Sequence, residues 1–220
     1  MLKPLLYKAA QNAVYGQRYE YEKGNISDAL FVFLDGIPSP DSIDTIDKNY
    51  RKRPLVCLTD EWEEYIKKAY PNAQIYKRYM MKPACHFKTK GSTSLPGEFK
   101  LALFDKKAFE LHPFSHGENY SSFEEFQKHG LGAVVWHNGE IVSSASSFLS
   151  FNNEVELDVS TKEAYRQKGL ASACISLMLQ NCEQRGITVH WDAQNETSLH
   201  LAEKFGFEKD FHYFVYFLPE

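Results

Sequence analysis

The chain has 220 residues, of which 43% are hydrophobic, enough for one large domain or two small ones with proper cores. The net charge is −4, and Lys and Arg are scattered apart from the short run Arg51-Lys52-Arg53, which we read as a solvated loop. This distribution argues against a nucleic-acid-binding protein, which normally shows a basic face.

The sequence carries no pattern of export, membrane insertion or metal binding. No stretch approaches the roughly 20 apolar residues of a membrane span, and Met1-Leu2-Lys3-Pro4 lacks the apolar run of a signal peptide. The four cysteines form no CxxC pair, so no metal site is predicted. We therefore expect a cytoplasmic protein with no membrane partner and no metal, and a homodimer stays an open alternative.

The first part of the chain predicts a mixed α/β region. A polar segment with Pro38 and Pro40 separates its strands and is predicted to be a loop. In chain order we predict a helix over 5–15, a strand over 29–34 closed by Asp35-Gly36, a strand over 54–58, a helix capped by Thr59 and ended by Pro71-Asn72, and a strand over 74–80.

A segment rich in Gly, Ser and Thr, residues 88–97, is the best linker candidate. It places a boundary near residue 95 and divides the chain into an N-terminal α/β region, 1–95, and a second domain, 96–220. The first region shows no motif that carries chemistry. It is either a degenerate partner domain that shapes a cleft of the second domain or a dimerisation element.

The second domain has clearer patterns. Asn138-Gly139 is a strong hairpin signal, and the long helical pattern after it carries apolar residues at spacings of three and four. The predicted elements are a helix capped by Ser122 and ended at Gly130, strands over 132–136, 140–148 and 154–161 with a turn at Asn152-Asn153, a helix over 165–185 closed by Gly186, a strand over 187–193, a helix over 196–205 closed by Gly206, and a strand over 211–218.

The turn Arg166-Gln167-Lys168-Gly169-Leu170-Ala171 lies between a strand and the start of the long helix. A helix N-terminus offers unpaired N–H groups and a partial positive charge, which together favour a phosphate. Gly169 and Ala171 are small enough to let a diphosphate approach the backbone, and Arg166 and Lys168 add positive charge. The simpler alternative is an ordinary helix start with a solvated basic turn.

This turn resembles the R/Q-x-x-G-x-G/A signature of the GCN5-related N-acetyltransferase (GNAT) superfamily. Downstream, the segment Trp191-Asp192-Ala193-Gln194-Asn195, followed by Ser198 and by Ala202-Glu203-Lys204-Phe205-Gly206-Phe207, resembles its second CoA-side segment. The combination looks closest to the subgroup that includes zwittermicin A resistance acetyltransferases. The likeness covers about residues 120–218.

The resemblance implies an α/β (α+β) GNAT fold with a mixed central sheet, in which a splayed strand pair binds acetyl-CoA. It implies that acetyl-CoA is a co-substrate and that Asn195 hydrogen-bonds its pantetheine arm or helps order a water nearby. Asn195 also fits a plain helix N-cap. The other cofactor-binding residues that it implies are Val159, Ser160 and Thr161 on the strand, with Arg166, Gln167, Lys168, Gly169, Leu170 and Ala171 in the turn.

Acidic residues alternate with aliphatic ones over Glu154-Val155-Glu156-Leu157-Asp158-Val159, so three carboxylates share one face of a strand. One interpretation is a solvated acidic face. The other is a wall that attracts a cationic amine and supplies the general base, with Glu156 as the first choice and Asp158 as the second. The neighbouring run 143–147 is rich in serine and either contacts acceptor hydroxyls or fills the sheet.

The sequence departs from the superfamily pattern at Ala202, where many members carry a Tyr that protonates the departing thiolate. Ser198, one helical turn earlier on the same face, is therefore our candidate for that proton donor. Its alternative role is to pack or cap the helix. We also expect Ala202→Tyr to leave the fold intact.

The leading functional hypothesis is an acetyl-CoA-dependent N-acetyltransferase that acts on a primary amine of a small molecule, with an amino-polyol antibiotic and hence antibiotic resistance as one case. The alternatives are acetylation of a protein or peptide and a non-catalytic CoA-binding sensor.

Overall fold

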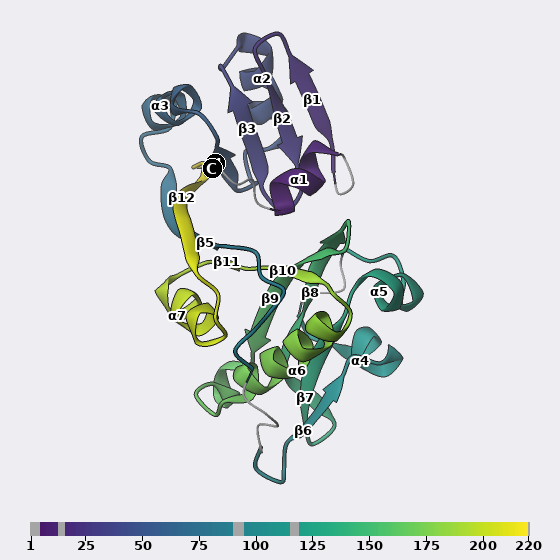
Figure 1. Cartoon of the computed structure of the whole chain (residues 1–220). Coiled ribbons are helices and arrows are strands. Elements are labelled where there is room, and N and C mark those ends of the chain that lie inside the picture. The colour runs from purple at the N-terminus through teal and green to yellow at the C-terminus, as the bar shows by residue number, and fades with distance from the viewer. Residues whose placement is uncertain (1–4, 13–15, 90–94, 115–118, 220) are drawn as a thin grey trace. The chain divides into compact units, whose positions relative to one another are not determined.

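The computed structural model describes residues 5–12, 16–89, 95–114 and 119–219, which form two compact units (Figure 1). Unit 1 comprises Met1–Met80 with Phe211–Glu220, and unit 2 comprises Met81–Asp210. We predicted a single boundary near residue 95 instead. The structure differs because β12 (Lys209–Phe217) pairs with β4 (Leu55–Cys57) and returns the chain to unit 1. Part of the predicted linker, residues 90–94, lies outside the described residues.

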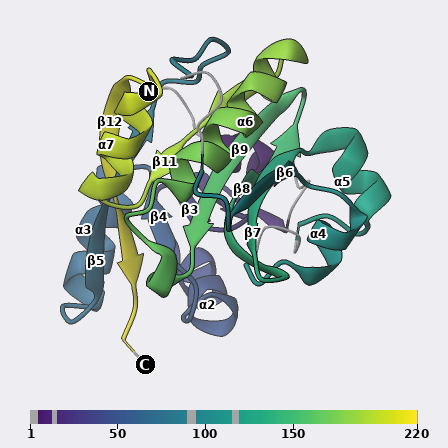
Figure 2. The same cartoon turned by 90° about the horizontal axis from the view of Figure 1, so that it is seen from below.

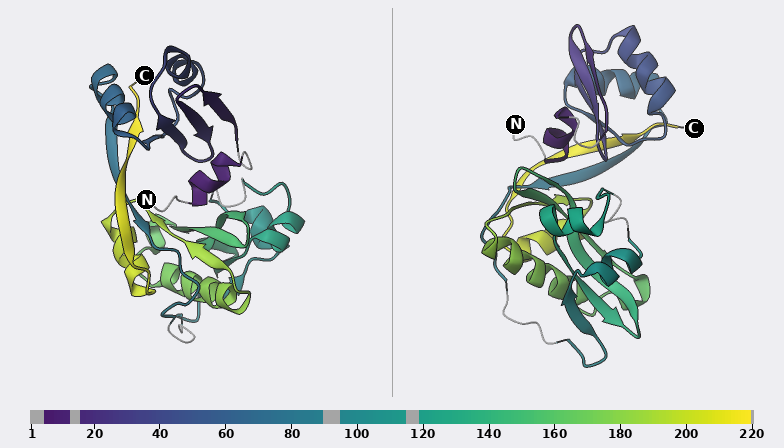
Figure 3. Two further views of the ribbon diagram at one scale, coloured as in Figure 1. Left: turned by 45° about the horizontal axis from the view of Figure 1, so that its top comes forward. Right: turned by 90° about the vertical axis from the view of Figure 1, so that its right-hand side faces the viewer.

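Unit 1 is a mixed sheet with helices on both faces. Its strands follow the order β1-β2-β3-β4-β12-β5, and β5 and β12 lie side by side as the long pair seen in Figure 3. The remaining elements are β1 (Arg18–Tyr21), β2 (Gly24–Asp28), β3 (Val32–Gly36), β5 (Gln74–Met81), α1 (Leu5–Gln11), α2 (Pro40–Asn49) and α3 (Asp60–Ala69).

Alternate residues of β3 face different helices, as the period of two in a strand requires. Val32 and Leu34 share a buried cluster with Ile46 of α2 and Ile66 of α3. Phe33 points the other way, and its ring meets that of Tyr7 in α1 edge-on at 5.3 Å. The two faces of the sheet are therefore covered by different helices.

The predicted loop around Pro38 and Pro40 is wrong, because this segment contains α2. Ser39 is its N-cap and forms a capping box with Ser42, and Pro40 is the first residue of the helix. Proline is well suited to that position, since its N–H would have no helical partner there.

Other boundaries in unit 1 shift by a few residues. The strand predicted over 29–34 begins at Val32, and the helix predicted over 5–15 ends at Gln11, with residues 13–15 outside the described chain. Thr59 occupies the N-cap position of α3 as predicted, but its hydroxyl donates to the Gly36 carbonyl at 2.7 Å and makes no cap hydrogen bond.

Unit 2 contains a mixed five-stranded sheet in the order β10-β9-β8-β7-β6, with α6 lying along it in Figure 2. Its parallel pair is β9 with β10, and the other neighbours are antiparallel. The elements are β6 (Lys100–Leu103), α4 (Lys106–Leu111), α5 (Phe123–His129), β7 (Gly132–His137), β8 (Glu140–Phe151), β9 (Glu154–Thr161), α6 (Leu170–Gln184), β10 (Thr188–His190), β11 (Asp192–Ala193) and α7 (Glu196–Lys204).

Both hairpins of unit 2 follow the predicted turns. Asn138 and Gly139 have φ of 51° and 83°, and Asn152 and Asn153 have φ of 50° and 61°. Two successive residues with positive φ match a type I′ turn, whose twist suits a tight hairpin. The predicted strand over 154–161 coincides with β9.

The long helix begins later than predicted. We predicted it from residue 165, but Glu163–Tyr165 is a short 3₁₀ turn and α6 starts at Leu170. The left-handed backbone at Gln167 and Gly169 prevents an earlier start, since a right-handed helix requires negative φ. No helix in the described part of the chain is long and apolar enough to cross a membrane.

Candidate functional site

The turn before α6 has the geometry of an anion site. Gln167 and Gly169 have φ of 62° and 76°, so the backbone around Lys168 alternates in hand. Such a backbone can direct successive N–H groups toward one point. The turn is exposed, and a Cβ built on Gly169 would meet no atom within 4 Å. The space beside Gly169 is thus open to a ligand group.

Positive charge surrounds this turn without an acidic ion-pair partner among the described residues. The Arg166 Nε donates to the Thr161 carbonyl at 3.4 Å, which leaves the guanidinium charge unneutralised. The Lys168 Nζ lies 5.4 Å from the ring centre of Tyr165 and 5.8 Å from that of Phe99. The turn before α6 is therefore positively charged and open beside Gly169, which are two properties of a site for an anion.

Within the described parts of the chain, the second half of the strand leading into the turn pairs with a strand on one side only. Glu154–Glu156 pair with residues 188–190 of β10, and β10 ends at His190. On its other side β9 pairs with β8 as far as Thr161. The predicted residues Val159, Ser160 and Thr161 lie in this second half and are half-buried.

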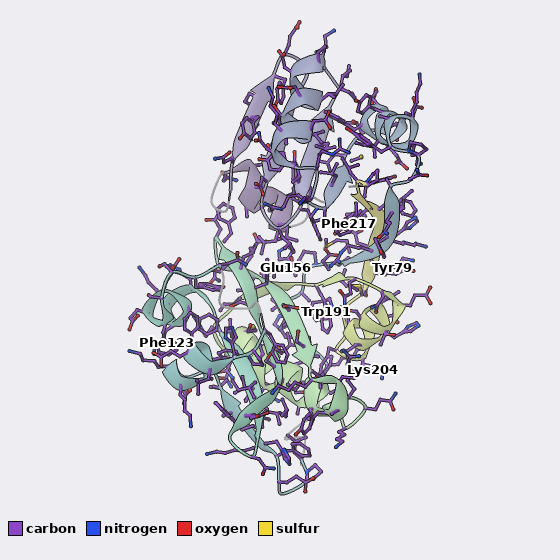
Figure 4. The ribbon with its side chains drawn as sticks, turned by 180° about the vertical axis from the view of Figure 1, so that it is seen from behind. Tyr79, Phe123, Glu156, Trp191, Lys204 and Phe217 are labelled. Carbon is purple, nitrogen blue, oxygen red and sulfur yellow. The ribbon has the colours of Figure 1, made fainter. Side chains whose placement is uncertain are left out.

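Glu156 lies where β10 ends, and its side chain is buried at 4% exposure (Figure 4). Its Oε1 accepts a hydrogen bond from the Asp192 N–H at 3.0 Å. The carboxylate therefore holds the chain that continues from β10 into β11. This contact gives Glu156 a structural role in addition to any catalytic one.

Asp158 lies two residues further along the same face of β9 and is half-buried. Its Oδ1 accepts from the Val159 N–H at 2.8 Å. Its cross-strand neighbour on β8 is Ser146, which is fully buried and whose Oγ has no hydrogen-bond partner among the described residues. Asp158 and Ser146 thus place a carboxylate and a hydroxyl side by side.

Two other serines of β8 make contacts within the fold. The Ser143 Oγ contacts the Thr161 hydroxyl at 2.8 Å, and the Ser147 Oγ accepts from the Tyr120 hydroxyl at 2.9 Å. These two side chains therefore fit the interpretation as sheet filler.

Sequence reasoning missed His190. It is 2% exposed, it lies beside Glu156 in the register of β9 and β10, and its Nε2 is hydrogen-bonded to the Glu154 carboxylate. The sequence signal for it is the alternation within the strand, which places the side chains of Val189 and His190 on opposite faces of the sheet. The acidic face of β9 is thus continued by an imidazole on β10.

Asn195 is the N-cap of α7, as one of the two interpretations predicted, and its side chain accepts from the Ser198 N–H at 2.9 Å. The Ser198 Oγ accepts in turn from the Trp191 Nε1 at 3.1 Å. An indole N–H can only donate, so this contact does not use the hydroxyl proton of Ser198. Ser198 therefore keeps a proton that it can donate.

Ala202 is fully buried, so a tyrosine there would strain the packing even if the fold persists, as we expect. We predict that Ala202→Tyr lowers the free energy of unfolding by about 1–3 kcal/mol, because it overpacks the interior. Urea denaturation measures this loss. His200→Tyr is the matched control, since His200 is exposed on the same helix. Equal stability of both variants would contradict the prediction.

Known proteins resemble this chain over nearly its whole length. A family model described as GNAT acetyltransferase matches residues 8–216. The uncharacterized N-acetyltransferase YdfB of Bacillus subtilis is 26% identical over 179 residues, which cover 77% of this chain and 67% of YdfB.

Solved structures agree with this match. A GCN5-related N-acetyltransferase-like protein from Streptococcus suis has a TM-score of 0.83 and 29% identity, covering 97% of this chain and 92% of that one. A GCN5-related N-acetyltransferase from Kribbella flavida has a TM-score of 0.67 at 11% identity, covering 100% of this chain and 97% of that one, and supports the fold alone.

Proposed function

Because this chain belongs to the GNAT acetyltransferase family and is an acetyl-CoA-dependent N-acetyltransferase, we propose that its acceptor is a primary amine of a small molecule. The observation that carries the proposal is the acidic row of β9, Glu154, Glu156 and Asp158, in the same unit as the anion-binding turn. A row of carboxylates attracts a cationic amine.

We assign the binding of acetyl-CoA to the turn before α6 and to the second half of β9. The amides from Gln167 to Ala171 hold the diphosphate, and Arg166 and Lys168 add charge. The backbone of residues 159–161 contacts the pantetheine arm, as a splayed strand does in the superfamily. Acetyl-CoA brings the activated acetyl group, and the chain's own residues orient it and move protons.

The acceptor must lose a proton before it can attack, because an alkylamine has a pKa of about 10.4. Glu156 is the first candidate for the base, acting directly or through a water, and Asp158 is the second. Glu156 is buried beside His190, so few water molecules compete with its carboxylate for the proton of the amine. The hydrogen bond between Glu154 and His190 places two more titratable side chains next to Glu156 on the sheet.

Ser198 is the proposed donor of a proton to the departing thiolate, since Ala202 replaces the usual tyrosine. We predict that Ser198→Ala lowers kcat at least tenfold while the Kd of acetyl-CoA changes less than twofold. General acids typically contribute about 10² to 10⁴ in rate, and a thiol is a fair leaving group without one. Steady-state kinetics and calorimetry measure the two quantities.

Ser198→Thr is the control for this prediction, because it keeps the hydroxyl. We expect it to retain most of kcat. Removing the hydroxyl also leaves the buried Trp191 Nε1 unpaired, which costs about 1–3 kcal/mol of stability. If Ser198→Ala loses stability but keeps kcat, Ser198 is a packing residue and not the acid.

The segment from Trp191 to Phe207 supports a narrower proposal, an acceptor of the amino-polyol class, as in the zwittermicin A resistance subgroup that this segment resembles. Release of free CoA in the presence of aminopolyols, aminoglycosides, polyamines and peptides tests it. Turnover with an aminopolyol supports the proposal. Turnover with peptides alone rejects a small-molecule acceptor, and binding of acetyl-CoA without any release of CoA indicates a sensor.

A further inference from the structure

Unit 1 contains a cavity of about 440 Å³, within the usual size range of small-molecule sites. Six Phe and Tyr side chains and three carboxylates line it, together with His212 and residues 56–59. None of the lining residues, all in the described part of the chain, is Lys or Arg. The aromatic residues are Tyr7, Phe33, Phe211, Tyr213, Phe214 and Tyr216, and the acids are Asp35, Asp60 and Glu63.

The cavity exists because two neighbouring strands separate. β4 and β12 are antiparallel and pair at Leu55 and Tyr216. Beyond that pair, residues 56–59 of one strand and 211–214 of the other line the cavity from opposite sides. A closed sheet would separate Asp35, on the face of α1, from Glu63 of α3. Here both reach the same space.

The strand opening also presents backbone polar groups to the cavity. The Leu58 N–H donates to the Leu34 carbonyl of β3 at 2.9 Å. Alternate residues of a strand direct their backbone groups to opposite neighbours. The N–H and C=O of Cys57 therefore point to the side from which β12 has separated.

The three carboxylates differ in how far they are already neutralised. Glu63 accepts at its Oε1 from Lys67 at 2.5 Å and from the Tyr216 hydroxyl at 2.8 Å, and these hydrogen bonds lower its pKa. Asp35 accepts from the Tyr7 hydroxyl at its Oδ2. Among the described residues Asp60 makes no ion pair. Asp35 and Asp60 thus supply most of the cavity's net negative charge.

We propose that this cavity is a binding site for an organic ammonium compound with an apolar body. Aromatic faces attract a cation through their quadrupole, and carboxylates beside them fix its position. The aromatic walls cover the apolar body, as in most small-molecule sites. The site belongs to unit 1 and does not depend on how unit 2 transfers the acetyl group.

The test compares 2-phenylethylammonium with 2-phenylethanol, which has the same shape but no charge, by calorimetry at pH 7.5. We expect the ammonium to bind the wild-type protein at least tenfold more tightly, about 1.4 kcal/mol. The double variant Asp35→Asn with Asp60→Asn should bind both probes equally. Asparagine at residue 35 can still accept from Tyr7, so the fold should persist.

Glu64→Gln is the matched control, because Glu64 lies exposed on α3 and does not line the cavity. It should retain the tenfold preference. Alkylation of Cys57 by iodoacetamide is a second test, because Cys57 lines the cavity. Burial raises the pKa of its thiol to about 12, so the reaction is slow and needs long exposure at pH 9. Bound ammonium should slow the alkylation of Cys57 at least fivefold further and leave the alkylation rate of the exposed Cys85 unchanged.

Three results would overturn the proposal. The first is that the wild-type protein binds both probes equally or binds neither. The second is that Glu64→Gln loses the preference for the ammonium as the double variant does, and the third is that bound ammonium does not slow alkylation of Cys57. Mass-spectrometric detection of N-acetylphenethylamine after addition of acetyl-CoA distinguishes a bound acceptor from a bound effector of the same chemistry. Either source supports an ammonium site in unit 1.

Discussion

Gly169→Glu is expected to weaken acetyl-CoA binding at least a hundredfold, about 2.7 kcal/mol. The new side chain would enter the open space beside the turn and place a negative charge where we assign the diphosphate. It would also force a residue with a Cβ into a backbone with φ of 76°. Calorimetric titration with acetyl-CoA measures the loss.

Gly139→Glu is the matched control for this variant. Gly139 has a φ of 83°, its surroundings are equally open, and it lies in a hairpin turn of the same unit. Both substitutions carry a similar backbone cost, roughly 1–2 kcal/mol. We expect Gly139→Glu to keep the affinity for acetyl-CoA. Unchanged affinity in Gly169→Glu would remove the turn before α6 as the diphosphate site.

Local signals predicted most of unit 2. Asn138-Gly139 and Asn152-Asn153 fix their hairpins through positive φ, which depends only on the two residues in the turn. Ser122 caps α5 by accepting from the Glu125 N–H, as its position before an acidic turn indicates. Such features need no knowledge of distant parts of the chain.

The division into units could not be predicted in the same way. Pairing of β12 with β4 joins Tyr216 to Leu55, and nothing near either residue in the sequence encodes it. The prolines before α2 were ambiguous for another reason. Pro40 ends a strand pattern and equally well starts a helix, and only the capping box between Ser39 and Ser42 decides between them.

The sequence predicts the part of the candidate site that lies within one strand, but not the part in which two strands are neighbours. The period of two placed Glu154, Glu156 and Asp158 on one face of β9. The position of His190 beside Glu156 depends on the parallel register of β9 and β10, which the sequence does not reveal. The same register explains why Glu156 is buried and not part of a solvated face.

Glu156→Gln is expected to lower kcat by about 10² to 10⁴, the range for loss of a general acid or base. Glutamine keeps the shape and can still accept from the Asp192 N–H, so the hydrogen bond that holds β11 should survive. The Kd of acetyl-CoA should change less than twofold. The loss in kcat should shrink as pH rises toward the pKa of the amine, about 10.4, because more acceptor is already deprotonated. Kinetics from pH 6 to pH 10 measure this trend.

Glu156→Ala separates the catalytic role of Glu156 from its structural role. Alanine removes both the base and the acceptor for the Asp192 N–H, which costs about 1–3 kcal/mol when the donor is left buried and unpaired. If Glu156 is the base, Glu156→Gln loses turnover at full stability, and Glu156→Ala loses both. If Glu156 only holds β11, Glu156→Gln retains turnover, and Glu156→Ala loses stability and turnover together at every pH. A loss of kcat in Glu156→Gln that does not change with pH would also reject proton transfer by Glu156. At high pH the amine is already deprotonated and needs no base, so the loss caused by removing a base must become smaller there.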